Sequence, residues 1–163
     1  MCEEDFSEFF QAEAGPLVTF VRRTGVGLEQ ARDAAQEAMT RAFLEWPELR
    51  LPRAWVRTTA TRIAIAEDAR TKDGIVRAVV GGWSVSTHVD PDVAVLGYEH
   101  EQLLKDLNTL PLRQRLVMTW KLDGFENDEI AEQLDMPAAT VRSNYRHARA
   151  TLRSAYLARG GQR

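Results

Sequence analysis

The chain has 163 residues, of which 44% are apolar and 28% are charged, with a formal net charge of -3. This is the composition of an ordinary globular protein, and it is enough to bury one core or two small ones. One cysteine, Cys2, excludes an internal disulfide or a cysteine metal cluster, and no apolar run approaches membrane-spanning length. The acidic start also lacks an apolar signal core, so we expect a cytoplasmic protein.

The first part of the chain predicts helices separated by turn residues. Apolar residues recur at helical spacings over residues 5–23, with an expected break near Gly15-Pro16, and a glycine-rich turn follows at 24–27. A second helix is predicted from Leu28 to Trp46, ended by Pro47. Its expected inward residues are Ala31, Ala34, Ala35, Ala38, Ala42 and Phe43.

A third helix is predicted from about Ala54 to Ala69, which gives a compact helical bundle over residues 5–70. Over residues 71–97 glycine, valine and serine rise and helical periodicity is lost, except around 75–80, so we expect a flexible linker. Helical patterning resumes at about Tyr98, with helices at 101–107 and 112–122 separated by Pro111. The expected fold is all-α, with a second small helical domain over residues 98–163.

The segment from Asn127 to Arg153 predicts a helix-turn-helix. Ile130 and Leu134 are spaced to face a following helix, and Asn127 is a plausible N-cap. Asp135 occupies the turn position that favours left-handed backbone geometry, which Asp tolerates better than most residues.

The long second helix of this motif carries two stripes at helical spacing. The apolar stripe consists of Val141, Tyr145, Ala148, Leu152 and Tyr156, and the basic stripe of Arg142, Arg146, Arg149 and Arg153. From residue 138 onward there are six arginines and no acid, whereas residues 99–137 hold nine acids and four bases. Two antiparallel helices with a basic face also occur in proteins that never touch DNA. The agreement of turn, caps and one-sided charge favours a nucleic-acid partner.

Two features of the first domain are candidate binding surfaces. Asp33 and Glu37 lie one turn apart, and Glu37 precedes Arg41 in the favourable order for a helical ion pair, although a solvated charged face explains them equally well. The segment from Leu49 to Ala66 interleaves arginines with Trp55 and threonines, which suits contact with phosphate and with unpaired bases. Spacing alone favours a core position for Trp55.

Three blocks of sequence resemble a known family. LPLRQRLVMTWKLDGFENDEIAEQLDMPAATVRSNYRHARATLR resembles the second conserved domain of extracytoplasmic-function (group IV) sigma factors of bacterial RNA polymerase, and DAAQEAMTRAFLEW with PRAWVRTTATRIA resembles the first. The resemblance covers nearly the whole chain except the linker. It implies a dissociable subunit that directs core polymerase to specific promoters and initiates transcription.

The resemblance also implies roles for individual residues. The residues that match the core-polymerase contacts are Asp33, Gln36, Glu37 and Arg41. The residues that match the region near the melted minus-ten element are Arg50, Arg53, Trp55, Arg57, Thr58, Thr61 and Arg62. The minus-thirty-five set is Arg142, Ser143 and Arg146, flanked by Thr140, Asn144 and Arg149. Core polymerase, promoter DNA and an anti-sigma factor are the expected partners, with no cofactor.

The sequence departs from the family pattern at two points, and a regulator and an enzyme are the alternative functions. The loop before Trp55 is shorter than in many family members, so a pocket for a flipped base cannot be assigned residue by residue. Arg62 also replaces an asparagine that is common in the family.

A stand-alone helix-turn-helix regulator would explain the C-terminal half, but residues 5–70 show no dimer seam or ligand-pocket signature. Three scattered histidines without a catalytic or metal motif argue against an enzyme.

Overall fold

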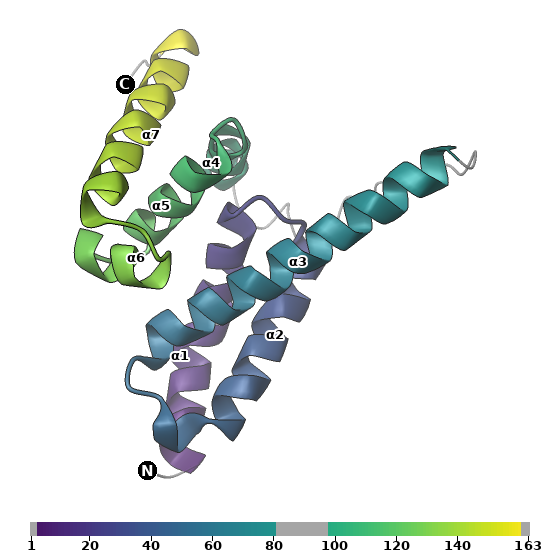
Figure 1. Cartoon of the computed structure of the whole chain (residues 1–163), viewed down its shortest axis with the longest axis vertical. Helices are drawn as coiled ribbons and strands as arrows, with labels where there is room; N and C mark the ends of the chain where they lie inside the picture. The colour runs from purple at the N-terminus through teal and green to yellow at the C-terminus, as the bar shows by residue number, and fades with distance from the viewer. Residues whose placement is uncertain (1–2, 81–97, 161–163) are drawn as a thin grey trace. The chain divides into compact units, whose positions relative to one another are not determined.

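A computed structural model of the chain describes residues 3–80 and 98–160, and it forms two compact helical units. Within these ranges every regular element is a helix, which confirms the predicted all-α fold (Figure 1). The N-terminal unit consists of α1 (Glu3–Arg23), α2 (Leu28–Leu44), the 3-10 helix η1 (Trp46–Glu48) and α3 (Pro52–Val80). The C-terminal unit consists of α4 (Tyr98–Asn108), α5 (Leu112–Leu122), α6 (Asn127–Gln133) and α7 (Ala138–Ala158). None of the helices described could cross a bilayer.

The first helix runs through the expected break at Gly15-Pro16, so that prediction was wrong. A proline inside a helix removes one backbone hydrogen bond and frees a carbonyl in the preceding turn. Here Gly15 and Pro16 are exposed, and so is Ala12, whose carbonyl loses its partner. Water can therefore satisfy that carbonyl, and the buried residues Leu17 and Phe20 in the next turn keep the helix in place.

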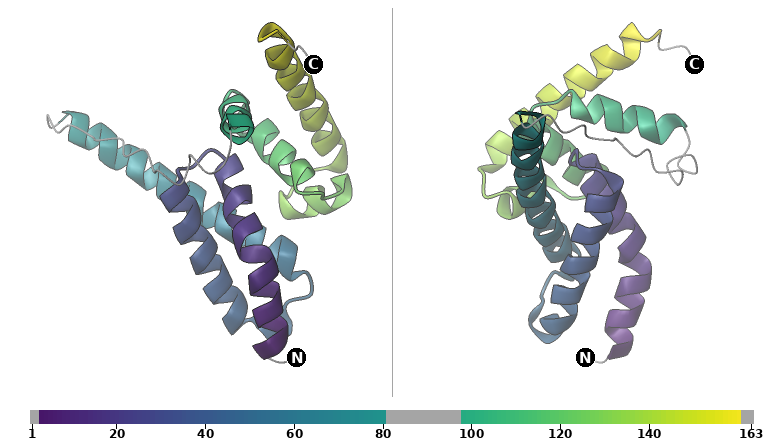
Figure 2. Two further views of the ribbon diagram at one scale, coloured as in Figure 1. Left: turned by 180° about the vertical axis from the view of Figure 1, so that it is seen from behind. Right: turned by 90° about the vertical axis from the view of Figure 1, so that its right-hand side faces the viewer.

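Alanines let α2 and α3 pack closely in the N-terminal unit. The five predicted inward alanines of α2 are all buried, and α3 contributes Ala54, Ala60 and Ala64 to the same core. Small side chains allow two helix axes to approach toward the lower end of the usual 8 to 10 Å range. Figures 1 and 2 show α1 and α2 next to each other with α3 crossing them.

Phe43 is not an inward residue as predicted, because 47% of its surface is exposed. It lies beside α1 at the end of α2, with its ring centroid 5.1 Å from that of Phe6. Phe6 also packs edge-to-face on Trp46 of η1 at 5.2 Å, and Phe9 lies 5.0 Å from the same indole. The aromatic residues thus close the end of the bundle and leave one face of Phe43 uncovered.

The third helix is longer than the sequence predicted. It was expected to end near Ala69, but it continues to Val80, through the 75–80 segment where some helical periodicity remained. The rest of the expected linker, residues 81–97, lies outside the described residues.

The C-terminal unit packs α7 across α4 and α5, with α6 joining α5 to α7. Leu107, Leu110, Met118 and Ala148 form its buried cluster. Trp120 is 1% exposed and packs edge-to-face on Phe125 at 4.7 Å, which fixes the turn between α5 and α6. The predicted helix boundary at Pro111 is confirmed, because Pro111 is the N-cap of α5.

Arg115 connects α5 to the end of α4. Its guanidinium donates to the backbone carbonyls of Leu107, at 3.0 Å, Asn108, at 3.2 Å, and Leu110, at 3.0 Å. The last carbonyls of a helix have no intrahelical partner, so a planar group with several donors satisfies them efficiently. Partial burial lowers the pKa of Arg115 from its ordinary value, and the side chain remains charged.

Candidate binding surfaces

The turn between α6 and α7 is a Schellman motif with Asp135 at its left-handed position. Asp135 has φ 49°, which confirms the backbone geometry that the sequence predicted. The amide of Met136 donates to the carbonyl of Ala131 at 3.0 Å, and the amide of Asp135 donates to the carbonyl of Glu132 at 3.4 Å. Because both orphan carbonyls are satisfied inside the turn, the angle at which α7 leaves α6 is fixed by the backbone.

The N-cap of α6 is Glu126 rather than Asn127, so that prediction was wrong by one residue. Glu129 explains the shift, since its carboxylate accepts a hydrogen bond from the Glu126 amide at 2.8 Å. This is the reciprocal half of a capping box, and it anchors the chain one residue earlier than Asn127 would. Ile130 is fully buried against the following helix, as its spacing predicted.

The two stripes of α7 lie in different environments. Val141 and Ala148 are buried, and Tyr145 and Leu152 are partly buried against the unit, so the apolar stripe docks as predicted. Tyr156, at the end of the stripe, is 51% exposed and extends past the packed surface. The whole basic stripe, Arg142, Arg146, Arg149 and Arg153, is exposed.

The polar residues of the first turns of α7 are less exposed to solvent than the arginines. Thr140, Ser143 and Asn144 are only partly exposed, and the Asn144 side-chain amide donates to the Thr140 carbonyl at 2.9 Å. The guanidinium of Arg149 lies 5.6 Å from the centroid of the Tyr145 ring, a cation–π contact that restricts its reach. Arg142 and Arg146 are therefore the residues of the predicted minus-thirty-five set whose side chains are least restricted.

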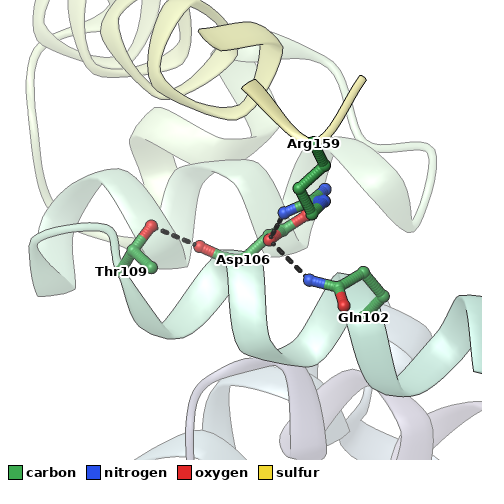
Figure 3. A network of polar contacts seen from close by, with 4 residues as sticks. All are labelled: Gln102, Asp106, Thr109 and Arg159. Carbon is green, nitrogen blue, oxygen red and sulfur yellow. Dashed lines mark hydrogen bonds and ion pairs between the residues drawn. The ribbon is translucent and has the colours of Figure 1, made fainter. Parts of the chain in front are cut away.

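A clamp between α4 and the residue after α7 holds the far end of α7. Arg159 donates to both carboxylate oxygens of Asp106, at 2.5 and 2.6 Å, in the bidentate geometry of a strong pair (Figure 3). Gln102 donates to the same carboxylate at 3.1 Å, and Thr109 donates to the Asp106 backbone carbonyl at 2.7 Å. The hydrogen bonds from Arg159 hold the pKa of the Asp106 carboxyl below its ordinary value, against an opposing effect of partial burial.

One edge of α2 is polar and exposed. Asp33, Gln36, Glu37 and Arg41 form this polar edge and are all exposed. Glu37 accepts a hydrogen bond from Arg41 at 2.8 Å, so the predicted helical ion pair is present. The edge is presented by a rigid helix whose opposite side is held by buried alanines.

An apolar groove that the sequence did not reveal adjoins this edge. It has a volume of about 550 Å³ and lies between α1 and α2, with Phe6, Phe10, Met39 and Phe43 among its lining. Gln36 belongs both to the groove and to the polar edge. The exposed faces of Phe10 and Phe43 are part of this groove.

The arginine-rich segment that precedes and begins α3 divides into exposed and buried residues. Arg50 and Arg62 are exposed, and Arg53, Trp55 and Thr58 are partly exposed. Trp55 is therefore not the core residue that spacing alone favoured. Arg57 and Thr61 are buried, at 0% and 7% exposure, so their predicted place among the DNA-facing residues does not fit this structure.

Arg57 has structural partners on two sides. Its guanidinium forms an ion pair with Glu13 of α1 at 2.7 Å and donates to the Arg53 carbonyl at 3.0 Å. It also lies 5.6 Å from the centroid of the Phe20 ring. Arg53 reaches the same glutamate at 3.5 Å from a more exposed position. The interaction joins α1 to α3, and nothing in the sequence around Glu13 indicated it.

The C-terminal unit and the helical fold are similar to those of known proteins. Residues 100–152 match the family model for sigma-70, region 4. The fold is similar to that of the sigma factor RpoE from Bartonella quintana, solved in complex with the anti-sigma factor NepR, with a TM-score of 0.73 and 21% identity over 93% of this chain and 96% of that one. It is also similar to CnrH, solved with the cytosolic domain of CnrY, with a TM-score of 0.67 and 19% identity over 98% of this chain and 91% of that one. No sequence among the curated proteins matches the chain.

The family match contains α6, the turn that follows it and α7 as far as Leu152. It confirms the predicted resemblance for the C-terminal unit, whose residues 100–152 are similar to sigma-70 region 4. The two structural relatives extend the shared fold over both units.

Proposed function

We propose that this chain is an RNA polymerase sigma factor of the extracytoplasmic-function group, which directs core polymerase to specific promoters and initiates transcription. The observation that carries the proposal is the recognition helix of a sigma-70 region 4 domain, with one stripe docked and its arginine stripe exposed. Helix-turn-helix proteins place the start of such a helix in the major groove, where arginine donates to guanine. The role is one of binding in the cytoplasm rather than catalysis.

The N-terminal unit supplies the polymerase contact in this proposal. The polar edge of α2 and the adjoining apolar groove together give charge for recognition and apolar area for affinity. An anti-sigma factor is a further expected partner. RpoE was solved with the anti-sigma factor NepR, and CnrH was solved with the cytosolic domain of CnrY.

The proposal is tested by adding the purified chain to core polymerase and transcribing fragmented genomic DNA of the source organism. A sigma factor is expected to copurify with the core enzyme and to yield discrete start sites that depend on its presence. A stand-alone regulator would instead bind duplex DNA tightly without polymerase and produce no new start sites. That outcome would overturn the proposal in favour of the regulator.

Charge reversal on the polar edge is expected to weaken assembly with core polymerase. We expect Asp33→Lys with Glu37→Lys to raise the Kd for the core enzyme about tenfold or more, because complementary charges that meet in the complex become like charges. Exposed substitutions of this kind change the free energy of unfolding by only about 0.5 kcal/mol, so the fold should persist. The Kd is measured by fluorescence anisotropy of the labelled chain.

The matched control reverses two exposed charges elsewhere in the same unit, Glu8→Lys with Glu48→Lys. It adds the same net charge without touching the polar edge. Equal weakening by both double variants would show a general effect of charge and would contradict a specific contact.

The arginines along α7 are expected to differ in whether they contact bases or the DNA backbone. Arg142 is on the exposed face near the start of the helix, and removing it should relax discrimination at one or two minus-thirty-five positions by about 1 to 3 kcal/mol. Arg153 lies about 16 Å further along the axis, too far for the same bases. Arg153→Ala should weaken binding evenly across sequences and lower its salt dependence.

The measurement is binding of the holoenzyme to a library of minus-thirty-five variants at two salt concentrations. Arg153→Ala serves as the control for loss of one positive charge on the same helix. An unchanged sequence profile for Arg142→Ala would remove Arg142 from the base-reading set.

A further inference from the structure

Tyr145 of α7 contacts two cations, one from its own helix and one from α5. The Cζ atom of Arg149 lies 5.6 Å from the centroid of the Tyr145 ring, and the Nζ atom of Lys121 lies 5.5 Å from the same centroid. A cation this close to an aromatic ring is attracted by the negative charge on the ring face. A leucine at this position would fill the same apolar stripe but would hold neither cation.

The core of the C-terminal unit fixes the position of the ring. Tyr145 is partly buried and packs against the cluster formed by Leu107, Leu110, Met118 and Ala148. These four residues are at most 5% exposed, so the ring is held against a closely packed surface. An exposed arginine that contacts the ring is thereby restrained by the core.

The ring contact determines where the Arg149 guanidinium lies along α7. Long side chains on a helix point toward its N-terminus and lie over the preceding turn. Arg149 follows Tyr145 by four residues, so its guanidinium is held back by up to about 6 Å along the helix axis, toward the level of Arg146. Arg153 has Arg149 and Ala150 in the preceding turn, which therefore offers it no ring.

The ring contact leaves the hydrogen-bond donors of Arg149 available. The N–H groups of a guanidinium all lie in its plane, and a cation–π contact uses none of them. A guanidinium held at a ring can therefore still donate to a phosphate. An arginine side chain also loses much rotamer freedom when it is immobilised by a ligand. If the ring has already restrained the side chain, less of that freedom is lost on binding, and the contact is tighter.

We propose that Tyr145 is a positioning residue for promoter binding, which holds the Arg149 guanidinium beside the start of α7 before DNA arrives. The inference rests on the proposed sigma-factor function. Tyr145 itself touches no DNA in this arrangement and acts through Arg149. The aromatic ring at this position, rather than its apolar bulk, is what promoter binding requires.

Lys121 gives the ring a second, structural role that the test has to separate from the first. Its Nζ atom lies 3.6 Å from a carboxylate oxygen of Glu126, the N-cap of α6, and its side chain is only 17% exposed. Loss of the ring would therefore also remove a contact from the turn between α5 and α6. Double variants distinguish the two routes, because each route needs its own cation.

The test measures the Kd of the holoenzyme, assembled with the full chain, for a promoter fragment. Tyr145→Leu is expected to raise Kd about two- to fivefold, the range for an exposed cation–π contact, whereas Tyr145→Phe keeps the ring and should bind like the wild type. In an Arg149→Ala background, Tyr145→Leu should raise Kd no further. In the control backgrounds Arg153→Ala and Lys121→Met it should keep its full effect. Tyr145→Met, which also packs without a ring, should behave as Tyr145→Leu does.

Three outcomes would overturn the positioning role in a holoenzyme that still transcribes. If Tyr145→Leu raises Kd by the same factor with and without Arg149, the residue serves packing alone. If its effect disappears in the Lys121→Met background instead, the ring acts through the turn between α5 and α6. If Tyr145→Leu and the wild type have the same Kd, the ring is not needed for promoter binding. Failure of the wild-type chain to assemble with core polymerase or to transcribe would instead overturn the proposed function itself.

Discussion

Arg57→Ala is expected to lower the free energy of unfolding of the N-terminal unit by about 3 kcal/mol or more. Removing one partner of a buried ion pair leaves the other charge without compensation, and such changes typically cost about 3 to 5 kcal/mol. Glu13 retains 18% side-chain exposure and the more distant Arg53, which places the loss toward the lower end of that range. The variant also loses the packing of a fully buried side chain.

The loss is measured by hydrogen exchange of peptides from α1 to α3 as a function of urea, which reports this unit separately. Arg53→Ala is the matched control, since its 3.5 Å contact with Glu13 is more exposed and is expected to contribute below about 1 kcal/mol. Adding Glu13→Gln to an Arg57→Met variant should recover part of the stability, because it removes the uncompensated charge. Protection of the Arg57→Ala variant equal to wild type would contradict a structural role.

Trp120→Ala is expected to destabilise the C-terminal unit by about 3 to 5 kcal/mol, the usual loss for truncating a buried indole. The side chain is 1% exposed and contacts Phe125 edge-to-face, so its removal leaves a cavity at the turn that leads into α6. The helix-turn-helix depends on that turn for its orientation. Loss of exchange protection in α5, α6 and α7 is therefore the expected readout.

Leu122→Ala is the control for this prediction, because Leu122 is an apolar residue of the same helix that is 44% exposed. It should cost about 1 kcal/mol or less, since little apolar area is lost. Comparable losses for the two variants would show that α5 is not anchored through Trp120.

Features with a local cause were predictable from the sequence. The docked stripe of α7 follows from helical spacing, and the left-handed backbone of Asp135 follows from its position between a helix and a proline. The exposed polar edge of α2 is the complement of its alanine face. Each of these features can be predicted from residues that lie within a few positions of one another in the sequence.

Features that depend on distant partners were not predictable. Arginine is normally exposed, and the burial of Arg57 depends on an ion pair with Glu13 of another helix at 2.7 Å. Pro16 signals a helix break, but its exposed position lets water replace the lost bond. An open hollow lined by Arg41 of α2 and by Arg62 and Arg70 of α3 likewise depends on how two helices pack, which spacing within either helix cannot reveal.

The clamp between Asp106 and Arg159 defines where the C-terminal unit ends as a folded structure. The family match stops at residue 152, whereas the attachment of the far end of α7 lies at Arg159. A fragment cut at the family boundary would keep the arginines of the predicted minus-thirty-five set, Arg142, Arg146 and Arg149, and would lose this attachment. The last turns of α7 would then fray, because a helix end without tertiary contacts is marginal in water. The shortest fragment that keeps α7 attached along its whole length must therefore include Arg159, the partner of the Asp106 carboxylate in α4. Sequence similarity alone would place that boundary too early.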